Sequence, residues 1–187
     1  MEALLTSIST VALAEIGDKT QLLALFLAAR FTSKSAIIFG ILFSTLLNHA
    51  ASAWFGVQAV YWVPDAWANW GVGLSFIAVG LWLLIPDKDE NEDGKMLKYG
   101  AFFATFILFF LAEIGDKTQI ATVLLGAHYG TVGWVLLGST IGMLIANVPV
   151  VFAGNWIMAR INPILTRRIA CGLFLLIGVA TIVSPLL

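Results

Sequence analysis

Six long apolar stretches separated by short polar connections organise this sequence. They run over residues 4–29, 36–57, 67–85, 97–127, 132–156 and 165–183. Each is long enough to cross a hydrocarbon core of about 30 Å as a helix that rises about 1.5 Å per residue. Because backbone polar groups in lipid must be satisfied within their own segment, we expect helices. The pattern predicts an all-α integral membrane fold with six transmembrane helices.

The basic residues fall on alternate connections. Eight Lys and Arg residues lie in the connections after the first, third and fifth stretches or within a few residues of them, at Arg30, Lys34, Lys88, Lys95, Lys98, Arg160, Arg167 and Arg168. The N-terminus, the second and fourth connections and the C-terminus have none. Since Lys and Arg are enriched in cytoplasmic loops, this pattern predicts that both termini lie outside the cytoplasm.

Composition agrees with a membrane protein. Hydrophobic residues make up 60% of the 187 positions and charged residues 11%, whereas a soluble domain is about 25% charged. A net charge of −1 gives no basic footprint for nucleic acid. The first apolar stretch lacks a preceding basic region, so we expect a retained span rather than a cleaved signal peptide.

The two halves of the chain repeat each other. Residues 13–21, LAEIGDKTQ, recur unchanged at 111–119, and glycines match at the same offset, as Gly40 does with Gly138. We therefore divide one transmembrane domain into a three-helix repeat at 1–86, an acidic cytoplasmic linker at 87–96 and a second three-helix repeat at 97–187. Because three spans are an odd number, the second copy enters the membrane from the opposite side. This is an inverted-topology repeat, which commonly places a substrate site at mid-membrane.

The repeated motif carries the candidate chemistry. Within one helix, residues three apart share a face, so each motif predicts a stripe of acids and an amide near mid-membrane. Hard oxygen ligands of this kind suit Ca²⁺, Mg²⁺ or Mn²⁺. With the two motif lysines the formal charge is −2, which one divalent cation balances. The predicted metal ligands are Glu15, Asp18, Gln21, Glu113, Asp116 and Gln119.

Other residues are expected to support this site. Gly17 and Gly115 permit a local helix break that exposes backbone carbonyls. Further supporting positions are Lys19, Thr20, Lys117, Thr118, Asn48, His49 and Asn147. For the polar residues of the second and fifth spans, interhelical hydrogen bonding is an equal alternative. Small-residue patterns at Gly40–Ser44 and Gly138–Gly142 favour close helix packing.

The doubled Glu-x-Gly-Asp-(Lys/Arg)-(Thr/Ser) motif, one copy in each half, resembles the Golgi-type cation/proton antiporter family and its bacterial MneA-type manganese exporters. The resemblance implies a multi-pass protein of a bacterial inner membrane that exports Mn²⁺ from the cytoplasm, with Ca²⁺ as the alternative substrate. It implies H⁺ or Na⁺ as the coupling ion and no tightly bound cofactor. The expected partners are the bilayer and the divalent cation, with no nucleic acid; an oligomer is compatible but not required.

Other interpretations stay open from the residues alone. Glu15 and Lys19 could form a purely structural ion pair, although two identical acidic motifs are costly to keep in a membrane for packing. A Ca²⁺/H⁺ antiporter or a passive divalent channel would use the same acids. An intramembrane aspartyl protease also uses two aspartates, but its pattern needs glycine where Glu15 and Glu113 stand. We expect a transporter and not an enzyme.

Overall fold

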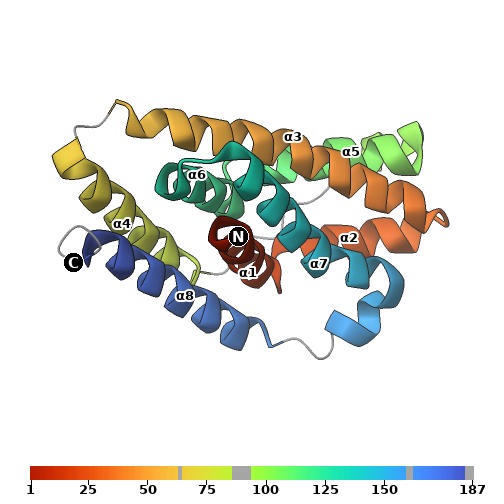
Figure 1. The fold of residues 1–187 in the computed structure, drawn as a ribbon. Coiled ribbons are helices and arrows are strands. Elements are labelled where there is room, and N and C mark those ends of the chain that lie inside the picture. Colours follow the sequence, from red (N-terminus) through yellow and green to blue (C-terminus); the bar gives the residue numbers. More distant parts are fainter. Residues whose placement is uncertain (63–64, 86–93, 159–161, 184–187) are drawn as a thin grey trace.

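The computed structural model describes residues 1–62, 65–85, 94–158 and 162–183, and all the regular elements in these ranges are helices. Figure 1 shows how they are arranged. Most of the predicted linker at 87–96 lies outside the described residues. The elements are α1 (Glu2–Glu15), α2 (Lys19–Arg30), α3 (Lys34–Val60), α4 (Asp65–Trp82), η1 (Gly94–Tyr99), α5 (Gly100–Glu113), α6 (Lys117–Tyr129), α7 (Val132–Met158) and α8 (Pro163–Val183).

Two of the six expected helices are broken. The stretch at 4–29 forms α1 and α2, and the stretch at 97–127 forms most of α5 and α6, with a bend of 70° between the helices of the second pair. The prediction that Glu15 and Asp18 share the face of one helix is therefore wrong. The helix ends at Glu15, and Gly17 follows with a φ of 82°, a left-handed conformation that interrupts the i, i+3 geometry.

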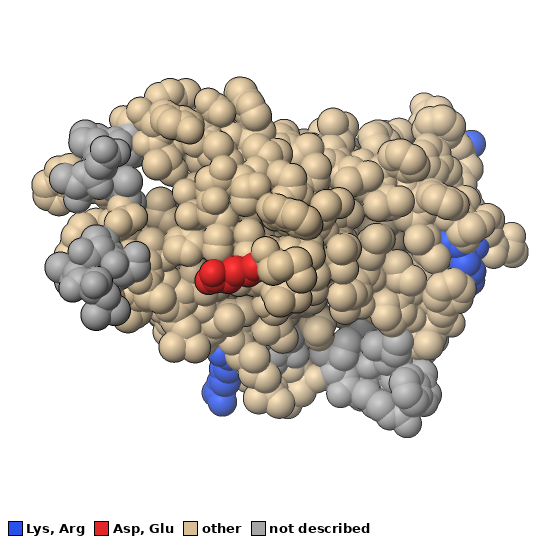
Figure 2. Space-filling view, in the orientation of Figure 1, with Lys and Arg blue, Asp and Glu red and all other residues tan. Residues whose placement is uncertain are grey.

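The longest helices have the length and composition of membrane spans. Among the described residues, Lys34–Val60 and Val132–Gly154 are long and apolar enough to cross a bilayer, and the bent α5–α6 pair makes a third if it counts as one span. Exposed apolar side chains follow one face of α3 at Phe39, Phe43 and Leu47. Figure 2 shows a face with very few charged side chains. These features fit a surface covered by lipid; the count of six spans stays a prediction.

The packing of the helices largely repeats between the halves. Helix α1 packs on α7 as α5 packs on α3, and α6 packs on α3 as α2 packs on α7. The two third helices, α4 and α8, run side by side (Figure 1). Glycines make the tightest approaches possible: a Cβ on Gly40 would lie 2.6 Å from Thr105 Cβ, and one on Gly138 would lie 2.6 Å from Leu4 O. The prediction of close helix packing at these small residues is confirmed.

One part of the packing is unequal. Helix α4 also packs on α6, and α8 also packs on α1. In the described part of the chain, the corresponding pairs under the repeat, α8 with α2 and α4 with α5, are not among the well-packed pairs. The third helices therefore lean together toward α1 and α6, so the two repeats have the same elements in different surroundings.

Candidate metal site

Each motif folds into a break between two half-helices. Gly17 and Gly115 adopt φ values of 82° and 74°, which cost a residue with a side chain about 1–2 kcal/mol. The amide of the residue after each glycine bonds back across the break: Asp18 N donates to Glu15 O, and Asp116 N donates to Glu113 O, both at 3.1 Å. Two breaks with the same backbone pattern therefore form from two identical sequences.

The motif glutamines hold the breaks together. Gln21 Oε1 accepts a hydrogen bond from Gly17 N at 2.8 Å, and Gln119 Oε1 accepts one from Gly115 N at 2.7 Å. A side chain at the third position of a helix that reaches back to the preceding backbone is typical of helix N-termini. Gln21 Nε2 also donates to Ala146 O on α7 at 2.7 Å. In this structure both glutamines stabilise the breaks, and their role as direct metal ligands stays a prediction.

Three buried carboxylates from the two repeats meet between the breaks. Oxygen atoms of Glu15, Glu113 and Asp116 all lie within 4.8 Å of one another. Oε1 of Glu15 and Oε1 of Glu113 are buried and have no hydrogen-bond partner in the described part of the chain. Asp18 is also buried, but it lies outside this group of three. The structure thus gathers three of the four predicted carboxylates.

The motif threonines hydrogen-bond to one oxygen of these carboxylates, the Oε2 of each glutamate and the Oδ2 of Asp116. Thr118 Oγ1 lies 3.1 Å from Glu113 Oε2 and 3.2 Å from Asp116 Oδ2, and Thr20 Oγ1 donates to Glu15 Oε2. Asp116 Oδ2 also accepts from Thr118 N at 3.3 Å, which caps α6. Each glutamate therefore has one oxygen fixed by the threonine of its own motif, while its other oxygen is left for a ligand.

The motif lysines reach beyond their own repeats. Lys19 Nζ lies 3.4 Å from Asp116 Oδ1, so this ion pair joins the first repeat to the second. Lys117 Nζ donates to Ile85 O at 2.8 Å and lies 5.8 Å from the centroid of the Trp82 ring. Ile85 and Trp82 were not predicted as site neighbours, because a contact to a backbone carbonyl far along the chain leaves no signal in sequence.

The helix ends add a field that favours a cation. The C-terminal ends of α1 and α5 carry Glu15 and Glu113, and the last carbonyls of a helix bear partial negative charge. Broken membrane helices commonly use such ends to bind cations. The arrangement can therefore hold one hard divalent cation between the repeats.

The supporting residues on α3 and α7 are all buried, with different partners. Asn48 Nδ2 donates to Phe110 O at 3.2 Å, an interhelical hydrogen bond of the kind left open as an alternative. Asn147 Nδ2 donates to Met143 O at 3.2 Å, and its Oδ1 has no hydrogen-bond partner among the residues described. His49 is buried, and neither of its ring nitrogens has a hydrogen-bond partner among the residues described.

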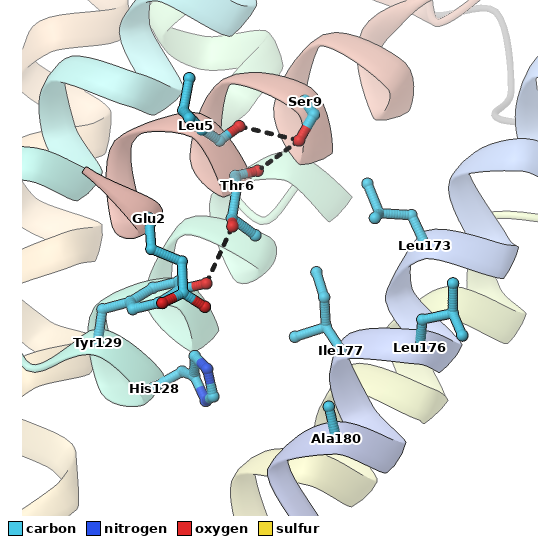
Figure 3. Close-up of a pocket in the computed structure, with 10 residues that line it drawn as sticks. All are labelled: Glu2, Leu5, Thr6, Ser9, His128, Tyr129, Leu173, Leu176, Ile177 and Ala180. Carbon is cyan, nitrogen blue, oxygen red and sulfur yellow. Dashed lines mark hydrogen bonds between the residues drawn. The ribbon is translucent and has the colours of Figure 1, made fainter.

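A cavity of about 380 Å³ lies apart from the carboxylates, at the start of α1 (Figure 3). Residues of α1, α6 and α8 line this open pocket, and Tyr129 Oη donates to Thr6 Oγ1 at 3.0 Å within it. Of the described residues that line it, Glu2 is the only acidic one. This cavity has no cluster of carboxylates, and Glu2 offers a carboxylate outside the candidate site for comparison.

Comparison with known proteins decides the family. The family model of the divalent cation/proton antiporter GDT1 matches residues 3–91 and 101–186, which is nearly the whole chain. The chain belongs to this family. The GDT1 family consists of transporters, so the expectation of a transporter and not an enzyme is confirmed, and the protease alternative is set aside. Membership of this family supports the transport of divalent cations.

Individual relatives agree with this membership. The chain is 51% identical to a Vibrio cholerae protein named "Putative manganese exporter", over 97% of this chain and 90% of the relative. It is 29% identical to a GDT1-like protein of Synechocystis, over 91% and 92% of the two chains. It is 27% identical to GDT1-like protein 3 of rice, over 98% of this chain and 75% of the relative. No solved structure matches this chain.

Proposed function

We propose that this protein exports Mn²⁺ from a bacterial cytoplasm in exchange for H⁺, at one site shared by its two repeats. The observation that carries the proposal is the group of three buried carboxylates, two of whose oxygens have no hydrogen-bond partner among the described residues. Oxygen ligands and a net negative site suit a divalent cation. The name of the Vibrio cholerae relative favours Mn²⁺ as the substrate.

The same crowding provides a reason for exchange. Two carboxylates about 5 Å apart repel each other by about 3 kcal/mol at an effective dielectric constant of about 20. Three ionised carboxylates in a buried site therefore need positive charge beyond that of Lys19, which pairs with Asp116. Either a divalent cation or protons can supply it, and both compete for the same oxygens. Binding of one substrate then releases the other, as antiport requires.

We infer an inverted topology for the two repeats, with α1–α2, α3 and α4 as three spans and α5–α6, α7 and α8 as three more. The matching pairs of helix contacts support it. By the positive-inside rule, we expect the end of α2, the start of α5 and the end of α7 to lie on the cytoplasmic side, because the basic residues are found there. Both termini then lie outside the cytoplasm. In this topology we expect the carboxylates near mid-membrane, where inverted repeats commonly hold their substrate.

Mn²⁺ uptake by proteoliposomes tests this function. Vesicles with an acidic lumen are given external Mn²⁺, and we expect uptake that depends on the pH gradient and alkalinises the lumen. Glu113→Gln should slow it by about tenfold or more, a loss typical even of groups that only support metal ligands. Glu2→Gln removes the same charge outside the carboxylate group, so its uptake should be unchanged.

Each alternative has its own signature in this assay. Uptake that is independent of the pH gradient but depends on a Na⁺ gradient would show that Na⁺, not H⁺, is the coupling ion. Uptake that follows neither gradient would indicate a passive channel. Gradient-dependent movement of Ca²⁺ without Mn²⁺ would keep antiport and overturn the choice of substrate.

A further inference from the structure

The three carboxylates of the candidate site differ in how many of their oxygens already have partners. Oε1 of Glu15 and Oε1 of Glu113 have no hydrogen-bond partner in the described part of the chain. Both oxygens of Asp116 are engaged: Oδ2 accepts from Thr118 N at 3.3 Å, and Oδ1 lies 3.4 Å from Lys19 Nζ. Asp116 is therefore the member of the group whose oxygens are both in use by the protein itself.

The ion pair between Lys19 and Asp116 opposes the binding of a cation. A hard divalent cation bonds to a carboxylate oxygen at about 2.0–2.6 Å. Since Lys19 Nζ lies 3.4 Å from Asp116 Oδ1, a cation on this oxygen would lie within about 6 Å of the ammonium group. Two positive charges this close repel each other strongly where little water screens them. The cation and the ammonium group therefore compete for Asp116 Oδ1.

Of the two partners, Lys19 is the one that can move. It is the first residue of α2, directly after the break, and its long side chain is 18% exposed, whereas the side chain of Asp116 is 4% exposed. Moving Asp116 would also break the cap that its Oδ2 provides at the start of α6. Binding of a cation therefore displaces the ammonium group and leaves the carboxylate in place.

The sequence of the motif does not by itself dictate this contact. In the second repeat, Lys117 stands at the same place in an identical sequence. It donates to Ile85 O at 2.8 Å and lies 5.8 Å from the centroid of the Trp82 ring. A motif lysine can thus be held by a backbone carbonyl and an aromatic ring. The contact of Lys19 with Asp116 is a property of the assembled site, in which the first repeat places a positive charge on a carboxylate of the second.

We propose that Lys19 is a release residue: its ammonium group and the transported cation occupy Asp116 in turn, and the return of the ammonium group helps the cation to leave. The inference rests on the proposed function, because it assumes that the three carboxylates bind the transported cation. An exporter has to give up its ion as well as bind it. Because changes in affinity are mostly changes in dissociation rate, a competitor that lowers the affinity speeds release.

Calorimetric titration of Mn²⁺ into the purified protein in detergent tests the proposal. A charge this close changes the affinity of a carboxylate for a proton by about tenfold or more. We expect a similar effect on a metal ion, so Lys19→Met should bind Mn²⁺ about tenfold more tightly than the wild-type protein. Lys19→Arg keeps the positive charge and should bind as the wild-type protein does. Lys34→Met is the matched control: Lys34 Nζ donates to Ala28 O, outside the carboxylate group, so its affinity should be unchanged.

Uptake of Mn²⁺ by proteoliposomes supplies the second readout. Tighter binding slows release, so we expect Lys19→Met to show a lower half-saturation concentration together with a lower maximal rate. A purely structural ion pair predicts the opposite, because loss of Lys19 would then misplace Asp116 and weaken binding. Lys19→Gln, which keeps a polar side chain without the charge, repeats both measurements if Lys19→Met does not fold.

The possible failures separate the two proposals. Unchanged or weaker Mn²⁺ binding by the uncharged variants at Lys19 would overturn its role in release and leave the proposed function standing. Equally tight binding by Lys19→Arg would do the same, since the positive charge would then not be the cause. Failure of the wild-type protein to bind Mn²⁺ would overturn both the release residue and the proposed function.

Discussion

At the scale of single residues, the threonine of each motif is the group that prepares a glutamate for a cation. The hydroxyl of Thr118 lies within hydrogen-bond distance of one oxygen of Glu113 and one of Asp116, and its single proton serves one of them at a time; Thr20 donates to Glu15. Hydrogen bonds to charged groups contribute about 1.5–3 kcal/mol. The threonines therefore fix the carboxylates in place before the cation arrives.

Thr118→Val tests this role. The change removes the hydroxyl and keeps the branched shape, so we expect Mn²⁺ binding to weaken by about tenfold, which corresponds to about 1.4 kcal/mol. Thr122→Val is the matched control: Thr122 is also buried on α6, but its hydroxyl donates to Thr118 O within the helix. Binding titrations of the two variants should differ, and equal affinities would remove Thr118 from the site.

The sequence predicted which acidic residues form the site, but it did not predict which residues they pair with. The duplicated motif pointed to Glu15, Glu113 and Asp116, which meet in the structure. It did not reveal that Lys19 pairs with Asp116 of the other repeat. The reason is physical: the i, i+4 geometry of an unbroken helix would pair Lys19 with Glu15, and the break removes that geometry.

At the scale of the elements, the breaks at Gly17 and Gly115 decide where the acids go. A continuous helix would point Glu113 and Asp116 along one face, whereas the break places both beside Glu15. Sequence permitted a break at these glycines but did not require one. The break is stabilised by a glycine in the left-handed conformation together with a glutamine side chain that accepts a hydrogen bond from the freed backbone amide.

Gly115→Ala tests the need for the left-handed conformation. A Cβ there meets nothing within 4 Å, so the cost is conformational alone, about 1–2 kcal/mol. We expect a melting temperature lower by a few degrees in detergent. Gly172→Ala is the control, since this glycine is helical and equally open, and alanine there should stabilise by about 0.5–1 kcal/mol. Unchanged stability of Gly115→Ala would mean that the break relaxes without its glycine.

At the scale of the whole molecule, the repeat explains both the likeness and the difference between the halves. The offset seen in sequence carries over to the helix contacts, which match pair by pair around α3 and α7. The lean of α4 and α8 toward α1 and α6 has no counterpart in sequence. Transporters with inverted repeats use this kind of asymmetry to change access.

The central claim is that both repeats contribute to one cation site. Calorimetric titration of Mn²⁺ into the purified protein measures it directly, with Glu15→Gln and Glu113→Gln as variants. We predict one high-affinity Mn²⁺ per chain, abolished by either substitution, because oxygens of both glutamates belong to the same group of three. Two ions per chain, with each substitution removing only one of them, would show that each motif binds its own cation and would contradict the shared site.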